Sequence, residues 1–248
     1  MKQRADKLLL EQGLASTREK ARALILAGLV YVGEARVDKA GQLLVVETVL
    51  AVRGKACPYV SRGGLKLEAA LEAFHPRLEG AVCADVGAST GGFTDCLLQH
   101  GAARVYALDV GHGQMDSSLR SDPRVVCLEG INARTLAAGF FPEPVALVTV
   151  DASFISLKLL LPAIRASAPE AFVIALVKPQ FEAGRKEVGR GRGVVKDPLV
   201  RARALSEVCQ AAIALGYTRL GTLESPVKGP KGNVEFLVHL APGEDPSP

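Results

Sequence analysis

Residues 82–93 read Val-Cys-Ala-Asp-Val-Gly-Ala-Ser-Thr-Gly-Gly-Phe: a short apolar run ends in an acid, and a glycine-rich turn follows. A helical pattern then begins at Phe93. Strand, glycine-rich turn and helix, in this order, form the nucleotide-type site of an open α/β sheet. Glycine lacks a Cβ, so its backbone turns tightly and lets a ligand lie against it, and the next helix offers free N–H groups. The stretch therefore predicts an α/β fold with a small-molecule site at this turn.

A second apolar run, residues 103–109, ends in Asp109. It lies about 20 residues beyond the glycines, the spacing at which a carboxylate can accept both hydroxyls of a ribose. The chain has no G-x-x-x-x-G-K-[ST] phosphate motif, and Asp85 would repel a pyrophosphate. S-adenosylmethionine, a cationic nucleoside, is therefore favoured over NAD or ATP; the alternative is an ordinary turn between two strand-capping aspartates. The candidate cofactor-binding residues are Asp85, Gly87, Ala88, Ser89, Thr90, Gly91, Gly92, Phe93 and Asp109.

Length and composition set further bounds. A chain of 248 residues can bury a full core and hold two domains. No apolar run reaches the roughly 18 residues that span a membrane, and no charged-then-apolar leader opens the chain. The five cysteines are odd in number and never spaced C-x-x-C, so we expect reduced thiols in a cytoplasmic protein. The four histidines do not cluster in the sequence, and no metal site is expected.

Residues 1–47 are predicted to form a small separate α+β domain. A capping box at residues 16–19, with Ser16 as the cap, begins a helix that Gly28 closes, and a hairpin follows over residues 30–37. Basic residues crowd this segment and suit a face laid against phosphates, although charges on a small domain are often only solvated. The candidate RNA contacts here are Arg4, Lys7, Arg18, Lys20 and Arg22.

Residues 48–60 follow neither a helical nor a strand period and are interpreted as a linker. In residues 61–248, short apolar runs alternate with helical stretches, which predicts a mostly parallel sheet covered on both faces. A Pro/Gly/Lys-rich loop at residues 225–232 predicts a final hairpin with one antiparallel strand. Seven strands with this ending resemble the class I, Rossmann-like methyltransferases. The runs after the glycine turn are residues 103–109, 125–128, 145–150, 172–177, 217–223 and 234–240.

Charged residues stand where ligands bind in such a sheet, at the ends of strands. Asp151 and Lys178 each follow an apolar run, and Glu235 opens the last one. A buried Lys178 needs a partner, and Asp151 on the neighbouring strand is the nearest candidate. A structural ion pair at the sheet's edge is the alternative. Lys66 lies in the first turn of a helix that residues 61–64 open, where surface lysine is the usual interpretation.

Two resemblances add to this picture. Arg4-x-Asp6, residues 13–21 (Gly-Leu-Ala-Ser-Thr-Arg-Glu-Lys-Ala) and residues 25–33 (Ile-x-x-Gly-x-Val-x-Val-Gly) resemble the S4 RNA-binding domain. That resemblance implies binding of structured RNA through a basic helix.

Motifs along the whole chain resemble the TlyA (haemolysin A) family of rRNA 2′-O-methyltransferases, in which an S4 domain is joined to an FtsJ-like catalytic domain. They are Ser61-Arg62-Gly63-Gly64-x-Lys66-Leu67, residues 85–93, Asp109-Val110-Gly111-x-Gly113-Gln114, Asp122-Pro123-Arg124-Val125, Asp151-x-Ser153-Phe154-Ile155-Ser156, Lys178-Pro179-Gln180-Phe181-Glu182 and Gly232-Asn233-Val234-Glu235. The resemblance implies a catalytic tetrad of Lys66, Asp151, Lys178 and Glu235, S-adenosylmethionine as cofactor, and ribosomal RNA or ribosomal subunits as partner. Because the chain stops soon after Leu240, it resembles the short form, which implies a cytidine of large-subunit rRNA as the target.

The segment of residues 182–197 is rich in glycine and basic residues. It follows the strand that carries Lys178 and is expected to close on RNA, or else to be an ordinary surface loop. The further candidate RNA contacts are Arg62, Arg185, Arg190 and Arg192.

Two other functions stay open at this point. Residues 87–91 fit G-x-S-x-G, a hydrolase elbow with Ser89 as nucleophile, and Asp151 and His239 follow in the order that a triad needs. The chain could also be a non-catalytic RNA-binding ribosome assembly factor that keeps the cofactor fold without turnover. The haemolysin label points to a membrane pore, but nothing in the sequence spans or coats a bilayer, and no membrane partner is expected.

Overall fold

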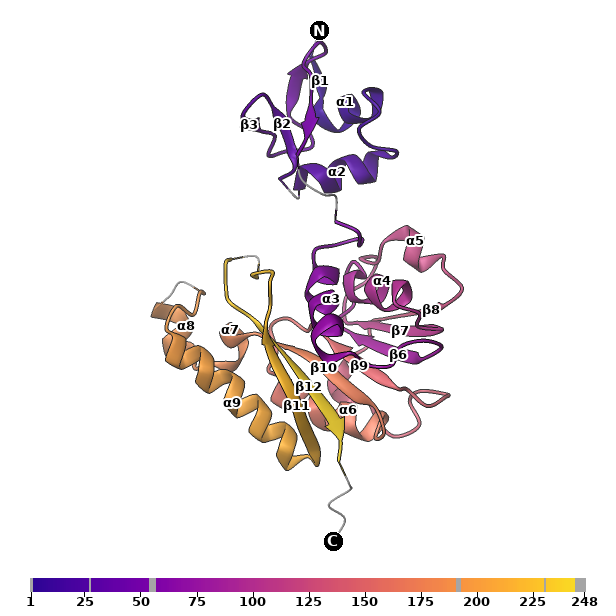
Figure 1. The fold of residues 1–248 in the computed structure, drawn as a ribbon, viewed down its shortest axis with the longest axis vertical. Helices are drawn as coiled ribbons and strands as arrows, with labels where there is room; N and C mark the ends of the chain where they lie inside the picture. The colour runs from indigo at the N-terminus through magenta and orange to yellow at the C-terminus, as the bar shows by residue number, and fades with distance from the viewer. Residues whose placement is uncertain (1, 27, 54–56, 191–192, 230, 244–248) are drawn as a thin grey trace. The chain divides into compact units, whose positions relative to one another are not determined.

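The computed structural model describes residues 2–26, 28–53, 57–190, 193–229 and 231–243, and the side chains of Leu26, Arg185, Lys186 and Arg190 lie outside that description. The chain divides into two compact units, Met1–Pro58 and Tyr59–Pro248 (Figure 1).

The N-terminal unit packs two helices against short strands. Its elements are β1 (Lys2–Arg4), α1 (Ala5–Glu11), α2 (Arg18–Leu26), β2 (Val30–Val32), β3 (Ala35–Arg36), β4 (Leu43–Val45) and β5 (Ala51–Val52). Strands β2 and β3 form the expected antiparallel hairpin, and β1 pairs with β4. Leu8, Leu9 and Ile25 from the two helices pack with Val30 in a small apolar core.

Two details of this unit differ from the sequence analysis. Thr17, not Ser16, caps α2, because the Thr17 hydroxyl accepts the Lys20 N–H at 3.2 Å. Strand β5 lies within the segment that was expected to be a linker and pairs antiparallel with β2. Strand β5 pairs with the side of β2 that β3 leaves open, so the sheet of β2 and β3 extends into a stretch that carries no clear period of its own.

The larger unit contains the predicted seven-stranded sheet, in the order β11-β12-β10-β9-β6-β7-β8. Its strands are β6 (Val82–Val86), β7 (Arg104–Asp109), β8 (Val125–Glu129), β9 (Leu147–Val150), β10 (Phe172–Val177), β11 (Tyr217–Glu224) and β12 (Phe236–Pro242). Strand β12 runs antiparallel to both of its neighbours, and the remaining pairings are parallel. The predicted closing hairpin with one antiparallel strand is therefore confirmed.

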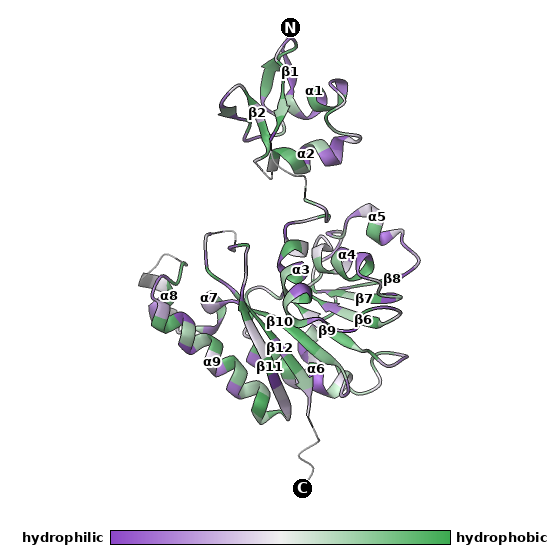
Figure 2. Cartoon of the chain, viewed as in Figure 1, coloured by the Kyte–Doolittle hydropathy of each residue, from purple (hydrophilic) through white to green (hydrophobic). Residues whose placement is uncertain are grey.

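Helices cover both faces of this sheet (Figure 1). The α-helices are α3 (Gly63–Phe74), α4 (Gly92–Gln99), α5 (Ser117–Arg120), α6 (Leu161–Ser167), α7 (Pro179–Glu182), α8 (Arg185–Arg190) and α9 (Pro198–Ala214), and two 3₁₀ turns are η1 (Ala133–Thr135) and η2 (Leu157–Leu159). On one face, Ile164 of α6 and Val208 of α9 join Val86, Val150 and Val177 of the strands in one core. Helices α3 and α4 pack together, and α4 contacts β6 and β7. Figure 2 shows strands β10 and β12 as hydrophobic, as burial between two helical layers requires.

The strand order reverses between β6 and β9, and this reversal opens a crevice at their carboxyl ends. The loop after β6 and the segment after β9 approach closely there: a Cβ on Gly87 would lie 2.8 Å from the Asp151 carbonyl oxygen. Gly87 also has φ +85°, which an L side chain rarely adopts. Glycine at this position therefore lets the two segments meet. Within the described residues, every helix is too short or too polar to cross a membrane.

Candidate active site

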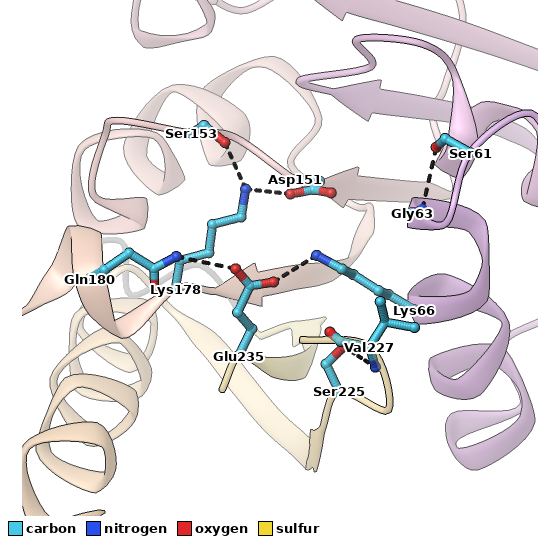
Figure 3. Close-up of polar contacts among 10 residues, drawn as sticks. All are labelled: Ser61, Gly63, Lys66, Asp151, Ser153, Lys178, Gln180, Ser225, Val227 and Glu235. Carbon is cyan, nitrogen blue, oxygen red and sulfur yellow. Dashed lines mark hydrogen bonds and ion pairs between the residues drawn. The ribbon is translucent and has the colours of Figure 1, made fainter. Parts of the chain in front are cut away.

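Two lysine–carboxylate pairs lie side by side at the carboxyl edge of the sheet (Figure 3). Lys178, directly after β10, places its Nζ 2.5 Å from Asp151 Oδ1, directly after β9. Lys66 of α3 places its Nζ 2.6 Å from Glu235 Oε2, directly before β12. The structure confirms the predicted pairing of Lys178 with Asp151, and it brings together four residues from four distant segments.

The four side chains are largely shielded from water. The exposed fractions are 10% for Lys66 and 1% for Glu235, and 8% for Lys178 and 21% for Asp151. Burying a lone charge is costly, so each lysine must be held by its carboxylate. The interpretation of Lys66 as a surface lysine is therefore wrong: the first turn of α3 turns this side chain inward, onto Glu235.

The tetrad shares a cavity of about 310 Å³ with the glycine-rich loop. Gly87, Ala88, Ser89, Thr90, Gly92 and Phe93 line it on one side, and all four tetrad residues line it as well. Arg62, the residue before α3, also lines the cavity, as does Lys228 of the loop between β11 and β12. Lys228 is a cation that the sequence analysis passed over. Gly91 does not line the cavity; its Cβ position would be filled by Leu119, 2.3 Å away.

Asp85 lies beneath the loop and does not line the cavity. Its side chain is fully buried and accepts hydrogen bonds from the hydroxyls of Thr94, at 2.7 Å, and Thr149, at 3.0 Å. Burial raises the pKa of Asp85 to about 7, against the opposing effect of the two hydroxyls. Asp85 therefore supports the loop from below, whereas the sequence analysis expected direct contact with a cofactor.

Asp109 ends β7 and holds the backbone around the loop. Its Oδ2 accepts the Ser89 N–H at 2.8 Å and its Oδ1 accepts the Gly111 N–H at 2.7 Å. Ser89 itself has φ +48°, an unusual value for a residue with a side chain, so this hydrogen bond helps hold the strained turn. The Ser89 hydroxyl donates to Gln114 Oε1 at 3.1 Å.

Three residues beside the tetrad were not singled out as site residues by the sequence analysis. Ser153 accepts a hydrogen bond from Lys178 Nζ at 2.9 Å, and Gln180 donates to Glu235 Oε1 at 3.2 Å. Phe154 is 91% exposed and contacts Phe181, with ring centroids 5.2 Å apart. Phe154 also lines a second, open cavity of about 850 Å³, together with Arg134 and Gln180. The only sequence signal for these residues was that each lies within a motif quoted for Asp151 or Lys178.

Two candidate RNA contacts in the N-terminal unit share a buried carboxylate. Arg4 donates to both oxygens of Asp6 at 2.9 Å, and Arg18 Nε donates to Asp6 Oδ2 at 3.0 Å. The hydrogen-bonded Arg4 guanidinium, aided by Arg18, lowers the pKa of Asp6 to about 2. The structure thereby brings Arg4 and Arg18 together, and the other candidates of this unit, Lys7, Lys20 and Arg22, are exposed.

The basic segment of residues 182–197 is more structured than a surface loop. It contains α8, and the buried Asn233 side chain accepts the Val195 N–H and donates to the Gly193 carbonyl, both at 2.9 Å. Arg185 and Arg190 lie at the two ends of α8, with side chains outside the description, and Arg192 lies outside the described residues.

The residues of a hydrolase triad are not assembled. His239 lies within β12, where its ring stacks on Phe74 at 5.1 Å and contacts Phe172. Burial lowers the pKa of His239, and its Nε2 makes no hydrogen bond to any residue that the structure describes. Ser89 instead bonds to Gln114. Among the described residues, no group of three His, Cys, Asp or Glu side chains could hold a metal ion.

Comparison with known proteins agrees with this architecture. Residues 59–241 match the FtsJ-like methyltransferase model and residues 3–50 match the S4 domain. The chain is 47% identical over 239 residues to the 16S/23S rRNA (cytidine-2′-O)-methyltransferase TlyA of Mycobacterium tuberculosis, covering 96% of this chain and 89% of that protein. It is 38% identical over 181 residues to the 23S rRNA (cytidine-2′-O)-methyltransferase TlyA of Campylobacter jejuni, covering 73% and 70%.

A solved Streptococcus thermophilus structure named for hemolysin is 43% identical, with a TM-score of 0.78 over 99% of this chain and 90% of that one. The family model covers most of the chain, and the similarity to the Mycobacterium tuberculosis protein runs through both units. The chain is therefore a member of the TlyA family, methyltransferases that join an S4 domain to an FtsJ-like domain.

Proposed function

We propose that the chain transfers a methyl group from S-adenosylmethionine to the ribose 2′-hydroxyl of a cytidine in large-subunit ribosomal RNA. The observation that carries this proposal is the meeting, in one cavity, of the glycine-rich loop and two lysine–carboxylate pairs. We assign RNA binding to residues 1–47, catalysis to residues 61–248 and the connection between them to residues 48–60, of which β5 also extends the sheet of the N-terminal unit. A ribosomal RNA substrate would make the protein cytoplasmic.

The residues of the cavity fit the cofactor. The backbone of residues 87–90 lines it, so a nucleoside can lie against main chain, and the turn is held open by Asp109. Asp151 and Glu235 suit a positively charged ligand. The bound cofactor supplies a methyl group on a sulfonium centre. Gly87, Ser89 and Thr90 would hold it. Asp109 does not line the cavity, but it bonds to Ser89, which does, and each of its carboxylate oxygens has a second lone pair for a ribose hydroxyl.

The tetrad's task is to place a weakly acidic hydroxyl and to receive its proton. Lys178 would act on the 2′-hydroxyl, because its Nζ lies at the cavity wall and is fixed by Asp151. As an ammonium it would donate a hydrogen bond to the hydroxyl oxygen and orient it, and as a neutral amine it would accept the hydroxyl proton through its lone pair while the oxygen becomes methylated. Lys66 would hold the same hydroxyl or the adjacent phosphate, with its direction set by Glu235. Gln180 in turn holds Glu235. Positioning a nucleophile within about 3 Å of its target, with water excluded, supplies much of the barrier reduction in such reactions.

RNA would reach this site through basic and aromatic surfaces. Arg62 lines the cavity itself, and the exposed Phe154 ring, which lines the second, open cavity, is a surface on which an unpaired base can stack. Arg4, Lys7, Arg18, Lys20 and Arg22 would contact phosphates from the N-terminal unit, and Arg185, Arg190 and Arg192 from the segment around α8. A large-subunit cytidine is proposed because both TlyA relatives above carry 23S rRNA and cytidine in their names.

The proposal is tested with labelled cofactor and unmodified ribosomes, separate subunits and free rRNA, followed by mapping of ribose methylation. We expect one methyl group on one large-subunit cytidine. Lys178→Ala should lower the rate by at least about 10³-fold and leave cofactor affinity within about twofold, because Lys178 acts on the hydroxyl. Full turnover by that variant would refute the role of Lys178.

The second candidate is a non-catalytic RNA-binding assembly factor, and the S4 match is the observation that favours it. It predicts tight RNA binding with no methyl transfer to any ribosomal substrate. The two shielded lysine–carboxylate pairs of the tetrad argue against this candidate, since RNA binding alone does not require such pairs beside a cofactor loop.

A further inference from the structure

Within the described residues, two polar contacts hold Lys178, and only one of them involves a carboxylate (Figure 3). The Lys178 Nζ also lies over the Phe181 ring, 5.9 Å from its centroid. Its Nζ lies 2.5 Å from Asp151 Oδ1 and donates a hydrogen bond to Ser153 Oγ at 2.9 Å. An ammonium group has three N–H donors on a flexible four-carbon stem. A single partner leaves such a group free to swing around it, whereas two partners in different directions determine where the third N–H points. Lys178 lines the cavity, so the third position on Nζ, an N–H of the ammonium or the lone pair of the neutral amine, is the one left for a substrate.

Ser153 is exposed, so something must hold it in place. It lies in the segment between β9 and η2, which is anchored at both ends. At the near end, the Asp151 N–H donates to the Val86 carbonyl at 2.9 Å. At the far end, Glu182 accepts the Ser156 hydroxyl at 2.5 Å and the Leu157 N–H at 2.8 Å. Between the anchors, Phe154 has φ +65°, a strained value for a residue with a side chain.

Glu182 connects the segment that carries Ser153 to the helix that begins next to Lys178. Lys178 is the residue that precedes α7, and Glu182 is the last residue of the same four-residue helix. The helix that begins next to Lys178 therefore holds the segment whose serine holds the Lys178 side chain. Glu182 is buried, and burial raises its pKa. Burying a carboxyl group costs free energy, and the two hydrogen bonds from Glu182 to the Ser153 segment offset part of that cost.

We propose that Ser153, held in place by Glu182 through Ser156 and Leu157, is a positioning residue that directs the third position on Lys178 Nζ, whether N–H or lone pair, toward the substrate hydroxyl. This inference rests on the proposed function. It assigns Ser153 no proton transfer: the serine accepts one hydrogen bond, and Lys178 remains the group that meets the substrate.

Three variants and one control test the inference in the full-length protein. Ser153→Ala removes the second contact of Lys178, and we expect kcat for methyl transfer to fall about 10- to 100-fold, since displacement of a reacting group by about 1 Å has effects of this size. The KM for RNA and the affinity for the cofactor should stay within about twofold. Ser153→Thr keeps the hydroxyl and should recover most of the rate. Glu182→Gln keeps the shape and loosens the anchor, and should lower kcat less than Ser153→Ala does.

Ser121→Ala is the matched control, because the Ser121 hydroxyl also makes one hydrogen bond, to the Ser117 carbonyl, at the end of α5 outside the tetrad. It should leave kcat unchanged. A Ser153→Ala protein with the wild-type kcat overturns the inference. So does one in which only the KM for RNA rises, because Ser153 would then be an RNA contact.

Crystal structures of wild type, Ser153→Ala and Ser153→Thr separate this inference from the proposed function. We expect the Lys178 side chain to occupy more than one conformer in Ser153→Ala and a single one in the other two. An unmoved, single Lys178 conformer in Ser153→Ala overturns the positioning role. Absence of methyl transfer by the wild type would refute the proposed function, and the conformers of Lys178 would still decide whether Ser153 positions it.

Discussion

Asp6 in the N-terminal unit and Asp85 in the larger unit are both 0% exposed, yet their surroundings differ in kind. The half-exposed guanidiniums of Arg4 and Arg18 donate hydrogen bonds to Asp6, and these cations lower the pKa of Asp6 to about 2. The partners of Asp85 are neutral: the hydroxyls of Thr94 and Thr149 and the Thr94 backbone N–H. Burial raises the pKa of Asp85 to about 7.

The difference shows that burial alone does not decide the charge of a carboxyl group; the partner does. In the larger unit, the buried lysines near the glycine-rich loop are paired with Asp151 and Glu235, and no cation among the described residues forms an ion pair with Asp85. The cations are thus placed where a substrate can meet them, and the group beneath the loop is held by neutral hydroxyls.

The largest expected effect concerns Asp85 and pH. Between pH 4 and 7 the folded chain keeps the Asp85 proton that the unfolded chain has lost, so the free energy of unfolding falls by about 1.4 kcal/mol per pH unit from this group. The total approaches about 4 kcal/mol at pH 7 and stays constant above it. Asp85→Asn, neutral at every pH, should match wild type near pH 4 and exceed its stability at pH 8, measured by urea unfolding across the range. An Asn variant less stable than wild type at pH 8 would show that Asp85 is favoured as an anion.

Asp6→Ala should cost about 3 kcal/mol, because it leaves two guanidiniums without the buried carboxylate that orders them. Hydrogen exchange of the amides in α1 and α2 would assign the loss to the N-terminal unit. The matched control is Asp38→Ala, which breaks the exposed Arg36–Asp38 pair of 2.7 Å in the same unit. That change should cost less than about 1 kcal/mol. Equal losses in the free energy of unfolding for the two variants would show that the burial of Asp6 does not set the size of the effect.

Acid should act on Asp6 in the direction opposite to Asp85. The pKa of Asp6 is lowered on folding, so its contribution is complete above pH 4 and is lost as the pH falls toward 2. The loss amounts to about 2 kcal/mol. Hydrogen exchange of α1 and α2, compared between wild type and Asp6→Asn over pH 2–5, should show a difference that shrinks as the pH falls. A difference independent of pH would mean that Asp6 does not titrate in this range.

The smallest expected effect is on RNA binding. Arg18 gives only its Nε to Asp6, so its remaining N–H groups can contact a phosphate. Arg18→Ala should weaken RNA binding by about 1 kcal/mol and lower the slope of log K against log salt by about one, measured by titration at several salt concentrations. Arg104→Ala removes an arginine paired with Glu143 at the opposite end of β7 from the site and should leave both quantities unchanged. An equal loss of RNA affinity in Arg18→Ala and Arg104→Ala would show that RNA binding depends on the net charge of the protein and not on a contact made by Arg18.

Much of the site was predictable because parallel strands end at a common edge. Asp151 and Lys178 each follow an apolar run, which was enough to predict their ion pair from the alternation of strands and helices. The glycine-rich turn was equally predictable from the sequence, since its glycines lie between an apolar run typical of a strand and a helical pattern. Lys66 was different: nothing local distinguishes it from a surface lysine, and its role rested on resemblance alone.

The amino-acid sequence alone predicted the seven strands of the larger unit and brought Asp151 and Lys178 to one edge of the sheet, because hydrophobic period and strand ends are local properties. Strand β5 and helix α8 lie in stretches with no clear period and were not predicted. Three features became visible only in the folded chain: Lys66 pairs with Glu235, Asp85 lies beneath the loop, and Ser153 holds Lys178. Those outcomes depend on segments up to 169 residues apart being brought within hydrogen-bonding distance, and the packing of the whole sheet sets that distance.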